Sequence, residues 1–262
     1  MAVSVGDHGM TGGGTISSTA FQGRGGDVSV TATGSALISG AGSAIRSGGD
    51  ASSPNVAPAG DITVNTGTLT VADSGVIQNG TTRDVAGSIT VTAKDAIVLR
   101  NGGAILSQAF TNNVGNVTIA APSLTIDNGL IQTSTIQEGN AGNIVAEIGT
   151  LTLISGGQIV ASSAQDATGA GGSIKVTAND VFASGQSPPL AGGEPAPVRP
   201  FSGIFSTTDG VGAAGQIAVA AHTVNLADTG RIDSSTTGGG QGGTIGVNAS
   251  TSLSLTGGAG LF

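Results

Sequence analysis

The sequence predicts an all-β protein, a right-handed, single-stranded parallel β-helix with three strands in each coil and about nine coils. Three observations support this fold class. Short runs of alternating apolar and polar residues recur along the chain, turn-forming Gly, Asn and Asp residues separate them, and the pattern repeats every 27 or 28 residues over much of its length. One such unit cannot cover its own apolar face, so consecutive units are expected to stack on a shared core. Right-handed winding is the expectation for crossovers between parallel strands.

Each unit opens with a first strand of the form G-x-[IV]-x-[VIA]. Its apolar residues are expected to point inward, because side chains alternate along a strand. The first apolar residues of the nine copies are Val3, Val28, Ile62, Ile89, Val117, Ile144, Ile174, Ile217 and Ile245. A second strand carries the pairs Leu69/Val71, Ile97/Leu99, Leu124/Ile126, Leu151/Leu153, Val224/Leu226 and Leu253/Leu255, and is less distinct at Leu37-Ile38 and Val181-Phe182.

The third strand begins with isoleucine in eight copies, at positions 16, 45, 77, 105, 131, 159, 204 and 232. A glycine precedes most of these copies, at positions 14, 75, 103, 129, 157 and 230, and the turn there is expected to need a positive φ, which glycine adopts without steric cost. Two residues after each isoleucine, and therefore on the same face, stand Ser18, Ser47, Asn79, Ser107, Thr133, Ala161, Ser206 and Ser234. We interpret them as a buried ladder of small polar groups that hydrogen-bond up the stack, since buried hydroxyls must be paired. The alternative is a corner at which the strand emerges into water.

Two insertions interrupt the repeat. Residues 48–59 lengthen one turn, and residues 183–203 form a proline-rich segment between a second and a third strand. Proline cannot donate to a strand ladder, so the longer insertion is expected to project as a loop with polyproline II character. Loops on rigid scaffolds often carry recognition, although a tolerated surface insertion is the simpler interpretation. The candidate recognition residues are Pro188, Pro189, Glu194, Pro195, Arg199 and Phe201.

Composition narrows the function classes. The net charge is −8, and the few Lys and Arg residues are scattered, so the basic stripe of a nucleic-acid-binding protein is missing. No apolar run is long enough to span a membrane as a helix, and the absence of cysteine excludes a disulfide framework. We expect residues 1–262 to form one β-helix domain that is an uncapped fragment of a longer protein.

The repeat itself has a recognisable form, G-[DNS]-I-x-V-x-A followed by L-x-L-x-[DN]-x-G-x-I-x-[ST]-[ST], best seen in residues 61–82 and 116–135. In this form it resembles the repetitive region of filamentous haemagglutinin-like exoproteins, the large adhesins of two-partner secretion. The resemblance covers nearly the whole chain and weakens at the two insertions. It implies a right-handed parallel β-helix, export through an outer-membrane transporter pore, and adhesion at the cell surface or after secretion. The family's secretion motif of the Asn-Pro-Asn-Gly type is not found in this sequence.

An enzyme must be weighed against this, because parallel β-helices include polysaccharide lyases and hydrolases. Such sites need clustered carboxylates. The outward first-strand residues are Ser29, Thr63, Thr90, Thr118, Val145, Lys175, Ala218 and Gly246, and the outward third-strand residues are Ser17, Arg46, Gln78, Leu106, Gln132, Val160, Phe205 and Asp233. Neither column stacks two acids, so we expect no catalytic residues, no cofactor and no metal. Asp73, Asp127 and Asp228 share a turn, where they are expected to act as turn-formers in one column.

Ice or crystal-surface binding is a third class. It requires a flat array of threonines, which Thr63, Thr90 and Thr118 begin and Val145 and Lys175 interrupt. The preferred hypothesis is therefore a structural and adhesive segment of a secreted or cell-surface protein. Its expected partners are a host or environmental surface, with glycans as one candidate ligand class, and the transporter pore of the parent protein, with no nucleic acid and no membrane span.

Overall fold

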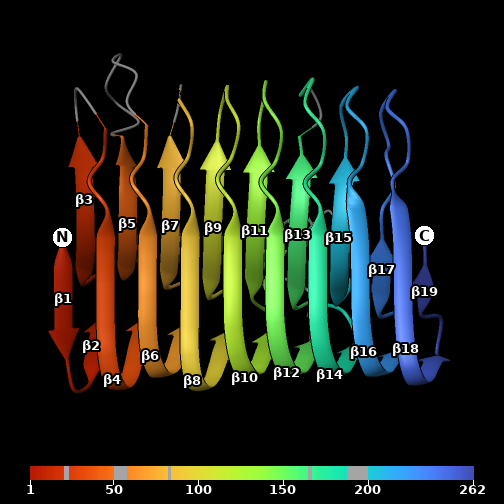
Figure 1. Cartoon of the computed structure of the whole chain (residues 1–262), viewed down its shortest axis with the longest axis horizontal. Coiled ribbons are helices and arrows are strands. Elements are labelled where there is room, and N and C mark those ends of the chain that lie inside the picture. The colour runs from red at the N-terminus through yellow and green to blue at the C-terminus, as the bar shows by residue number, and fades with distance from the viewer. Residues whose placement is uncertain (21–23, 50–57, 82–83, 165–166, 188–199) are drawn as a thin grey trace, which may run out of the picture.

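The computed structural model describes residues 1–20, 24–49, 58–81, 84–164, 167–187 and 200–262, and these residues form an all-β solenoid without a helix (Figure 1). Two parallel sheets run along its length. The first sheet contains β1 (Ala2–Val5), β2 (His8–Thr11), β4 (Val28–Ser39), β6 (Ile62–Ala72), β8 (Ile89–Arg100), β10 (Val117–Asp127), β12 (Ile144–Ile154), β14 (Ile174–Ser184), β16 (Gln216–Ala227) and β18 (Thr244–Leu255). The second contains β3 (Thr15–Ala20), β5 (Ala44–Gly49), β7 (Val76–Thr81), β9 (Ala104–Ala109), β11 (Leu130–Thr135), β13 (Gln158–Ser163), β15 (Gly203–Thr208), β17 (Arg231–Asp233) and β19 (Gly260–Leu261).

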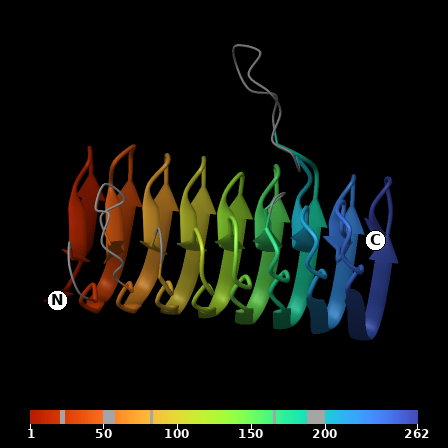
Figure 2. The same cartoon turned by 90° about the horizontal axis from the view of Figure 1, so that it is seen from above.

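Every strand pairs with its equivalents one winding before and after, so the strand order follows the sequence order of the windings. Val117, for example, pairs with Ile89 on one side and Ile144 on the other. From β1 to β18 the chain completes eight windings, which lie in a row from the N-terminus to the C-terminus (Figure 2). The predicted β-helix is therefore confirmed.

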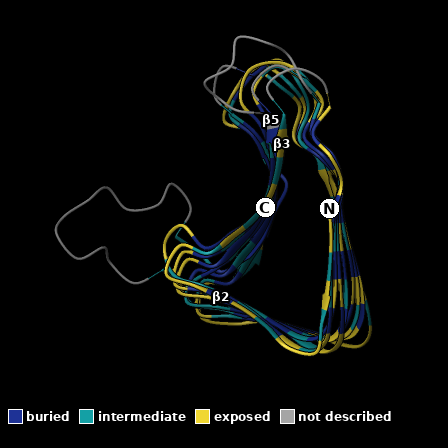
Figure 3. Cartoon of the chain, turned by 90° about the vertical axis from the view of Figure 1, so that its left-hand side faces the viewer, coloured by how far each residue is buried: buried dark blue, intermediate teal, exposed yellow. Residues whose placement is uncertain are grey.

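The three predicted strands of each coil become two. The predicted first and second strands are the two halves of one long strand, such as β10, which bends between Ala120 and Leu124 without leaving the sheet. Only the first coil separates the halves, as β1 and β2, which both pair with β4. The bend still gives three sides in cross-section, because each half lines its own face (Figure 3).

The winding is right-handed, as predicted. Figure 3 views the solenoid from its N-terminal end, with the long strands descending on the right and continuing along the bottom, and the short strands rising on the left. The chain thus runs clockwise as it recedes from the viewer, which defines a right-handed coil.

Columns of aliphatic side chains fill the interior. The inward residues of β10 and β12 at both halves, among them Ile119, Leu124, Ile144 and Leu151, are fully buried, as is Ile131 of β11. The structure also resolves the two indistinct second strands, because the inward residues there are Ala36 with Ile38 and Val181 with Ala183. Each buried Ile or Leu contributes about 1.5–3 kcal/mol before conformational entropy is deducted.

The glycines before the short strands have a different role from the one predicted. Gly75, Gly103, Gly157 and Gly230 do not have positive φ. A Cβ on any of them would come closer than 3.0 Å to a backbone oxygen of the preceding winding, so glycine is needed for close approach rather than for its dihedral freedom.

The positive φ falls instead on the corner residues just before these glycines. In the longer corners two consecutive residues have it, Asp73 and Ser74 (52° and 67°), Asn101 and Gly102 (50° and 77°), Ser155 and Gly156 (53° and 84°), and Asp228 and Thr229 (42° and 72°), whereas the corner at Asn128 has one (50°). Asn and Asp tolerate the left-handed region better than other non-glycine residues. The prediction assigned the turn geometry to the wrong member of the motif.

No helix among the described residues has the length and apolar character needed to cross a membrane.

Candidate functional site

The predicted ladder of small polar residues is buried. Side-chain exposure is 2% at Ser47, 0% at Asn79, Ser107, Thr133 and Ser206, and 4% at Ser234, while Ser18 in the first coil is half-buried. Ala161 occupies the same column. The alternative, a strand emerging into water at this corner, is therefore wrong.

The ladder's bonding partners differ from the prediction. Ser47 Oγ donates to Gly26 O (3.1 Å) and accepts from Gly60 N (3.0 Å), and Thr133 Oγ1 donates to Gly142 O (2.6 Å). Asn79 and Ser206 also bond to the backbone of such glycines. Among the described residues, the column members bond to the glycines that open the long strands and not to one another.

These glycines form a column of their own. They are the G of the first-strand motif, at positions 26, 60, 87, 115, 142, 172, 215 and 243. A Cβ on Gly142 would lie closer than 3.0 Å to Gly115 O, and a Cβ on Gly215 would lie 2.7 Å from Ser206 Oγ. The motif therefore pairs a polar side chain of the short strand with a glycine before the long strand. The polar side chain can reach the backbone there because glycine has no side chain.

A second buried polar column was not recognised in the sequence. Thr81, Thr135, Ser163 and Thr208 lie two residues after the first column and are at most 9% exposed. Thr135 Oγ1 donates to Glu138 O (2.6 Å) and Thr208 Oγ1 donates to Gly212 O (2.7 Å), so these threonines close the turn after their short strands, whereas the buried hydroxyl of Ser163 makes no such bond within the described residues. The signal was present, since these residues continue the inward alternation four positions after the isoleucine.

A third polar ladder lies outside, at the x position of the G-x-[IV] motif. It comprises Asp27, Asp61, Ser88, Asn116, Asn143 and Ser173. Each side chain accepts a hydrogen bond from the backbone N–H of the next member, at 2.9, 2.7, 3.3, 2.9 and 2.9 Å along the series. All five bonds have the same direction, from winding n+1 to winding n. Asp, Asn and Ser suit this position because their short side chains place an acceptor oxygen within reach of the backbone N–H that lies one strand spacing away.

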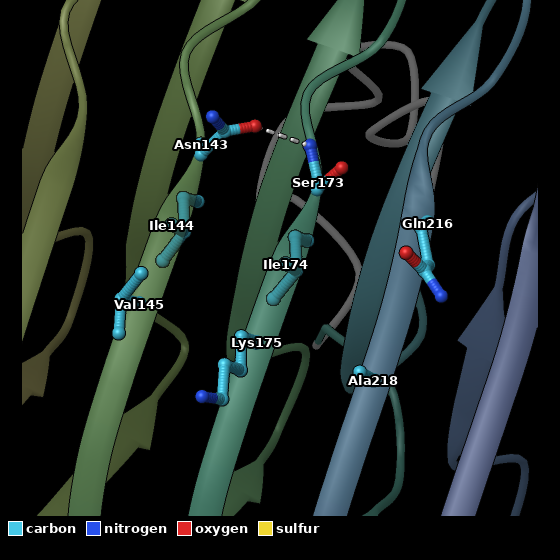
Figure 4. Close-up of a pocket in the computed structure, with 8 residues that line it drawn as sticks. All are labelled: Asn143, Ile144, Val145, Ser173, Ile174, Lys175, Gln216 and Ala218. Atoms are coloured by element: carbon cyan, nitrogen blue, oxygen red, sulfur yellow. Dashed lines mark hydrogen bonds between the residues drawn. The ribbon is translucent and has the colours of Figure 1, made fainter.

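This outer ladder stops between Ser173 and Gln216. No hydrogen bond joins Gln216 N to Ser173 Oγ, and Gln216 carries no bond onward to Thr244, within the part of the chain that is described. A hollow of about 280 Å³ lies on the outer face at this place, lined by Asn143, Ile144, Val145, Ser173, Ile174, Lys175, Gln216 and Ala218 (Figure 4). Lys175 is exposed and extends toward the winding of Val145.

The base of the long insertion is a short antiparallel stem. Gln186 bridges Phe201, and Ser187 N donates to Pro200 O (2.5 Å). Ser202 Oγ, fully buried, accepts from Gly156 N (2.8 Å). The stem is thereby fixed to the corner of the neighbouring winding.

An aromatic contact also fixes the stem. The guanidinium carbon of Arg231 lies 3.6 Å from the centroid of the Phe201 ring and 4.7 Å from the centroid of the Phe262 ring. Stacking of this kind contributes about 0.5–2 kcal/mol. Of the six candidate recognition residues only Phe201 is described, and Pro188, Pro189, Glu194, Pro195 and Arg199 lie outside the described residues. Most of the 48–59 insertion lies outside them as well.

The outward columns follow the predicted register. Ser29, Thr63, Thr90 and Thr118 pair in sequence, and Val145 and Lys175 interrupt them. At the other sheet, however, the outward Val160 and Phe205 are buried, at 5% and 1% exposure.

Within the described residues no three His, Asp or Glu side chains are close enough to hold a metal ion. That the chain catalyses neither hydrolysis nor elimination stays a prediction, and ice binding stays an untested alternative.

The three predicted turn aspartates do not form one column. Asp73 and Asp228 occupy the same corner position, whereas Asp127 lies one position earlier, paired with Arg100. Hydrogen bonds from Ser39 Oγ (2.7 Å) and then Asn101 Nδ2 (3.1 Å) lower the pKa of Asp73.

A similar arrangement occurs at the first bend of the solenoid. The backbone N–H of Ser35 (2.7 Å) and then its hydroxyl (3.0 Å) lower the pKa of Asp7. Both carboxylates hold neighbouring windings together, because each accepts from a residue one winding away.

Comparison of the chain with models of protein families, with curated proteins and with solved structures finds no match.

Proposed function

We propose that this chain is a structural and adhesive segment of a secreted or cell-surface protein of the filamentous haemagglutinin type. The observation that carries the proposal is the continuous pairing of both sheets, in which all nine equivalents of each strand pair in sequence order and the register shifts only at the bend of some long strands. Such a solenoid is a rod whose length grows by one strand spacing per winding. Rods of this kind hold a binding element away from the surface that anchors them.

The secretion part of the proposal rests on the resemblance of the repeat and on composition. The chain has no cysteine that would cross-link it before passage through an outer-membrane transporter pore. Its polar ladders and glycine columns form only when windings stack, which suits a chain that folds after export. The parent protein's transporter is the proposed export partner.

The attachment part assigns binding to the loop that the stem at Ser184–Ser187 and Pro200–Gly203 presents. Residues 188–199 can be replaced by a Gly-Asn turn that joins Ser187 to Pro200, since these two residues are already hydrogen-bonded. Adhesion of the purified chain to glycan arrays and to coated surfaces is then compared with that of the native chain. Loss of adhesion at unchanged thermal stability supports the assignment, and undiminished adhesion refutes it.

A scrambled 188–199 sequence of the same composition is the matched control, because it keeps loop length and proline content. A second control replaces residues 50–57 with Gly and Ser in equal number, which tests the smaller insertion in the same assay.

The hollow beside Lys175 is a second place for glycan binding. One exposed cation on an acidic chain, Lys175, extends there toward the winding of Val145. Ser173 and Gln216 are the polar residues on its other side, and within the described part of the chain their side chains do not bond to each other. An acidic sugar is the ligand class that fits, with its carboxylate on Lys175 and its hydroxyls on the two polar side chains. Lys175→Gln is expected to abolish binding of uronic-acid oligosaccharides and to leave neutral ones unaffected. Equal binding by both proteins would exclude the hollow.

A further inference from the structure

Three Asn-Gly steps occur in the chain, at Asn79-Gly80, Asn101-Gly102 and Asn128-Gly129. Asparagine followed by glycine is the dipeptide most prone to spontaneous deamidation, because glycine leaves the backbone nitrogen sterically open. We infer that folding protects the first two steps and leaves Asn128 as the deamidation site of the solenoid, with water as the only co-reactant.

The reaction has defined requirements. The backbone nitrogen of the glycine attacks the asparagine Cγ, a C–N bond forms, and ammonia leaves with the amide proton, which gives a five-membered succinimide. Water then opens the ring at either carbonyl and yields aspartate or isoaspartate. The nitrogen must be free of other hydrogen bonds, and the side-chain amide must be free to rotate.

Asn79 meets neither requirement. It is fully buried, its Nδ2 donates to Gly60 O, and its Oδ1 accepts from Gly87 N at 3.1 Å. Its side chain is one of the column members that join the short strands to the glycine column. Attack would require that column to open at this winding.

Asn101 is held as well. Its Nδ2 donates to Asp73 Oδ1 (3.1 Å), and the attacking nitrogen, Gly102 N, donates to Asn128 O (2.6 Å). Asn101 and Asn128 have the same φ of 50° at the same corner position. The φ of the asparagine therefore does not distinguish them. The φ of the following glycine does, since it is 77° at Gly102 and not positive at Gly129, and so do the hydrogen bonds.

At Asn128 the corner is one residue shorter. Arg100 and Ala104 are separated by three residues, whereas Asp127 and Leu130, which pair with them, are separated by two. In the longer corners the last glycine closes the turn, as in Gly103 N to Arg100 O (2.9 Å) and Gly157 N to Ile154 O (2.8 Å).

The missing residue removes that bond. Within the described residues Gly129 N makes no turn bond and the Asn128 side chain makes no hydrogen bond, although Asn128 is half-buried at the surface. Both groups that must react are thus free of hydrogen bonds, although Gly129 is buried whereas Asn101 and Gly102 are exposed.

The two products differ in their effect. Aspartate is compatible with this corner, since Asp73 and Asp228 occupy it in other windings. Isoaspartate adds a methylene to the backbone between Asn128 N, which bonds to Ile154 O (3.1 Å), and Asn128 O, which accepts from Gly102 N. The second product therefore breaks the stacking of the corner, and each product adds one negative charge.

The test incubates the whole chain at pH 7.4 and 37 °C, once folded and once unfolded in guanidinium chloride, and follows the mass increase by peptide mapping. Cleavage before aspartate separates the three sites, since Asp95 and Asp127 lie between them. Folding is expected to slow deamidation at Asn79 and Asn101 by about tenfold or more, the factor that 1.4 kcal/mol of local opening free energy imposes. At Asn128 the folded and unfolded rates are expected to agree within about twofold.

A variant with one glycine inserted after Gly129 restores the corner length seen at Asn101-Gly102-Gly103. Its deamidation at Asn128 is expected to fall to the folded rate of Asn101, with unchanged thermal stability as the folding control. The inference is overturned if folding slows Asn128 as strongly as Asn101, or if the insertion leaves the rate at Asn128 unchanged.

Discussion

The windings that begin with β4 to β14 and the last two, which begin with β16 and β18, share their glycine column but not their outer ladder. The buried core continues through β16, whereas Leu253 and Leu255 of β18 are exposed. In the first group, five hydrogen bonds in one direction join Asp27 to Ser173. In the second, Gln216 and Thr244 stand at the same position, and no bond among the residues that the structure describes continues the series. The core is thus still packed at β16, where the ladder has ended. This implies that the packing of the interior determines how the windings stack and that the outer ladder adds stability.

Substitutions in the glycine column are expected to destabilise both groups of windings equally, and more than any other change proposed below. Gly142→Ala and Gly215→Ala each place a Cβ closer than 3.0 Å to the backbone of the preceding winding, so each is expected to cost about 4 kcal/mol or more of unfolding free energy. Urea unfolding measures this loss. Gly246→Ala is the control, because its nearest atom would be 4.0 Å away. Tolerance of Gly215→Ala alone would show that the last windings are loosely stacked.

Removal of one ladder acceptor should distinguish the two groups. Asn143→Ala leaves the amide of Ser173 without its partner and is expected to cost about 0.5–1.5 kcal/mol. Gln216→Ala removes no bond of the ladder and should leave the unfolding midpoint unchanged. Equal losses for the two variants would contradict the difference between the regions.

Extension of the ladder is the converse experiment. The double variant Ser173→Asn and Gln216→Asn supplies acceptors of the length that works at Asn116 and Asn143. It should gain up to about 1 kcal/mol for each new bond, seen as a higher unfolding midpoint. A lower midpoint would mean that the windings around the 188–199 insertion are spaced too far apart for the ladder.

The smallest expected effect is on acid stability. The pKa of Asp73 is lower when folded than the ordinary value of 3.8, so its bonds stabilise the fold above that pH, and this contribution is lost as pH falls through the lower folded value. Ser39→Ala removes the first cause of the shift. Wild type and Ser39→Ala should therefore differ in melting temperature at pH 7 and converge below pH 3.8. A constant difference at all pH values would exclude the carboxylate.

The fold and the core could be predicted because period-2 alternation and a fixed repeat length determine which residues face inward. Ile131 and Leu124 were assigned correctly for this reason. The partners of the polar column were not, because the sequence shows which residues recur together but not which lie in contact. Ser47 recurs with Ser107, yet it bonds to Gly26 and Gly60, far from it in the motif.

The glycines were misassigned for a related physical reason. Glycine relieves both a strained dihedral and a close approach, and sequence alone does not separate the two causes. The burial of Phe205 could not be predicted for another reason. Whether an outward residue is buried depends on what covers the sheet and not on the repeat.

The direction of the strands has a mechanical consequence. They lie across the rod, so a pull on its two ends loads the hydrogen bonds between windings one row at a time, as in unzipping, and does not shear a whole sheet at once. Each winding of 27 residues, such as Val117 to Ile144, would then lengthen from one strand spacing to roughly 90 Å of extended chain. A tether built this way yields in small steps under drag and recoils when the load is removed.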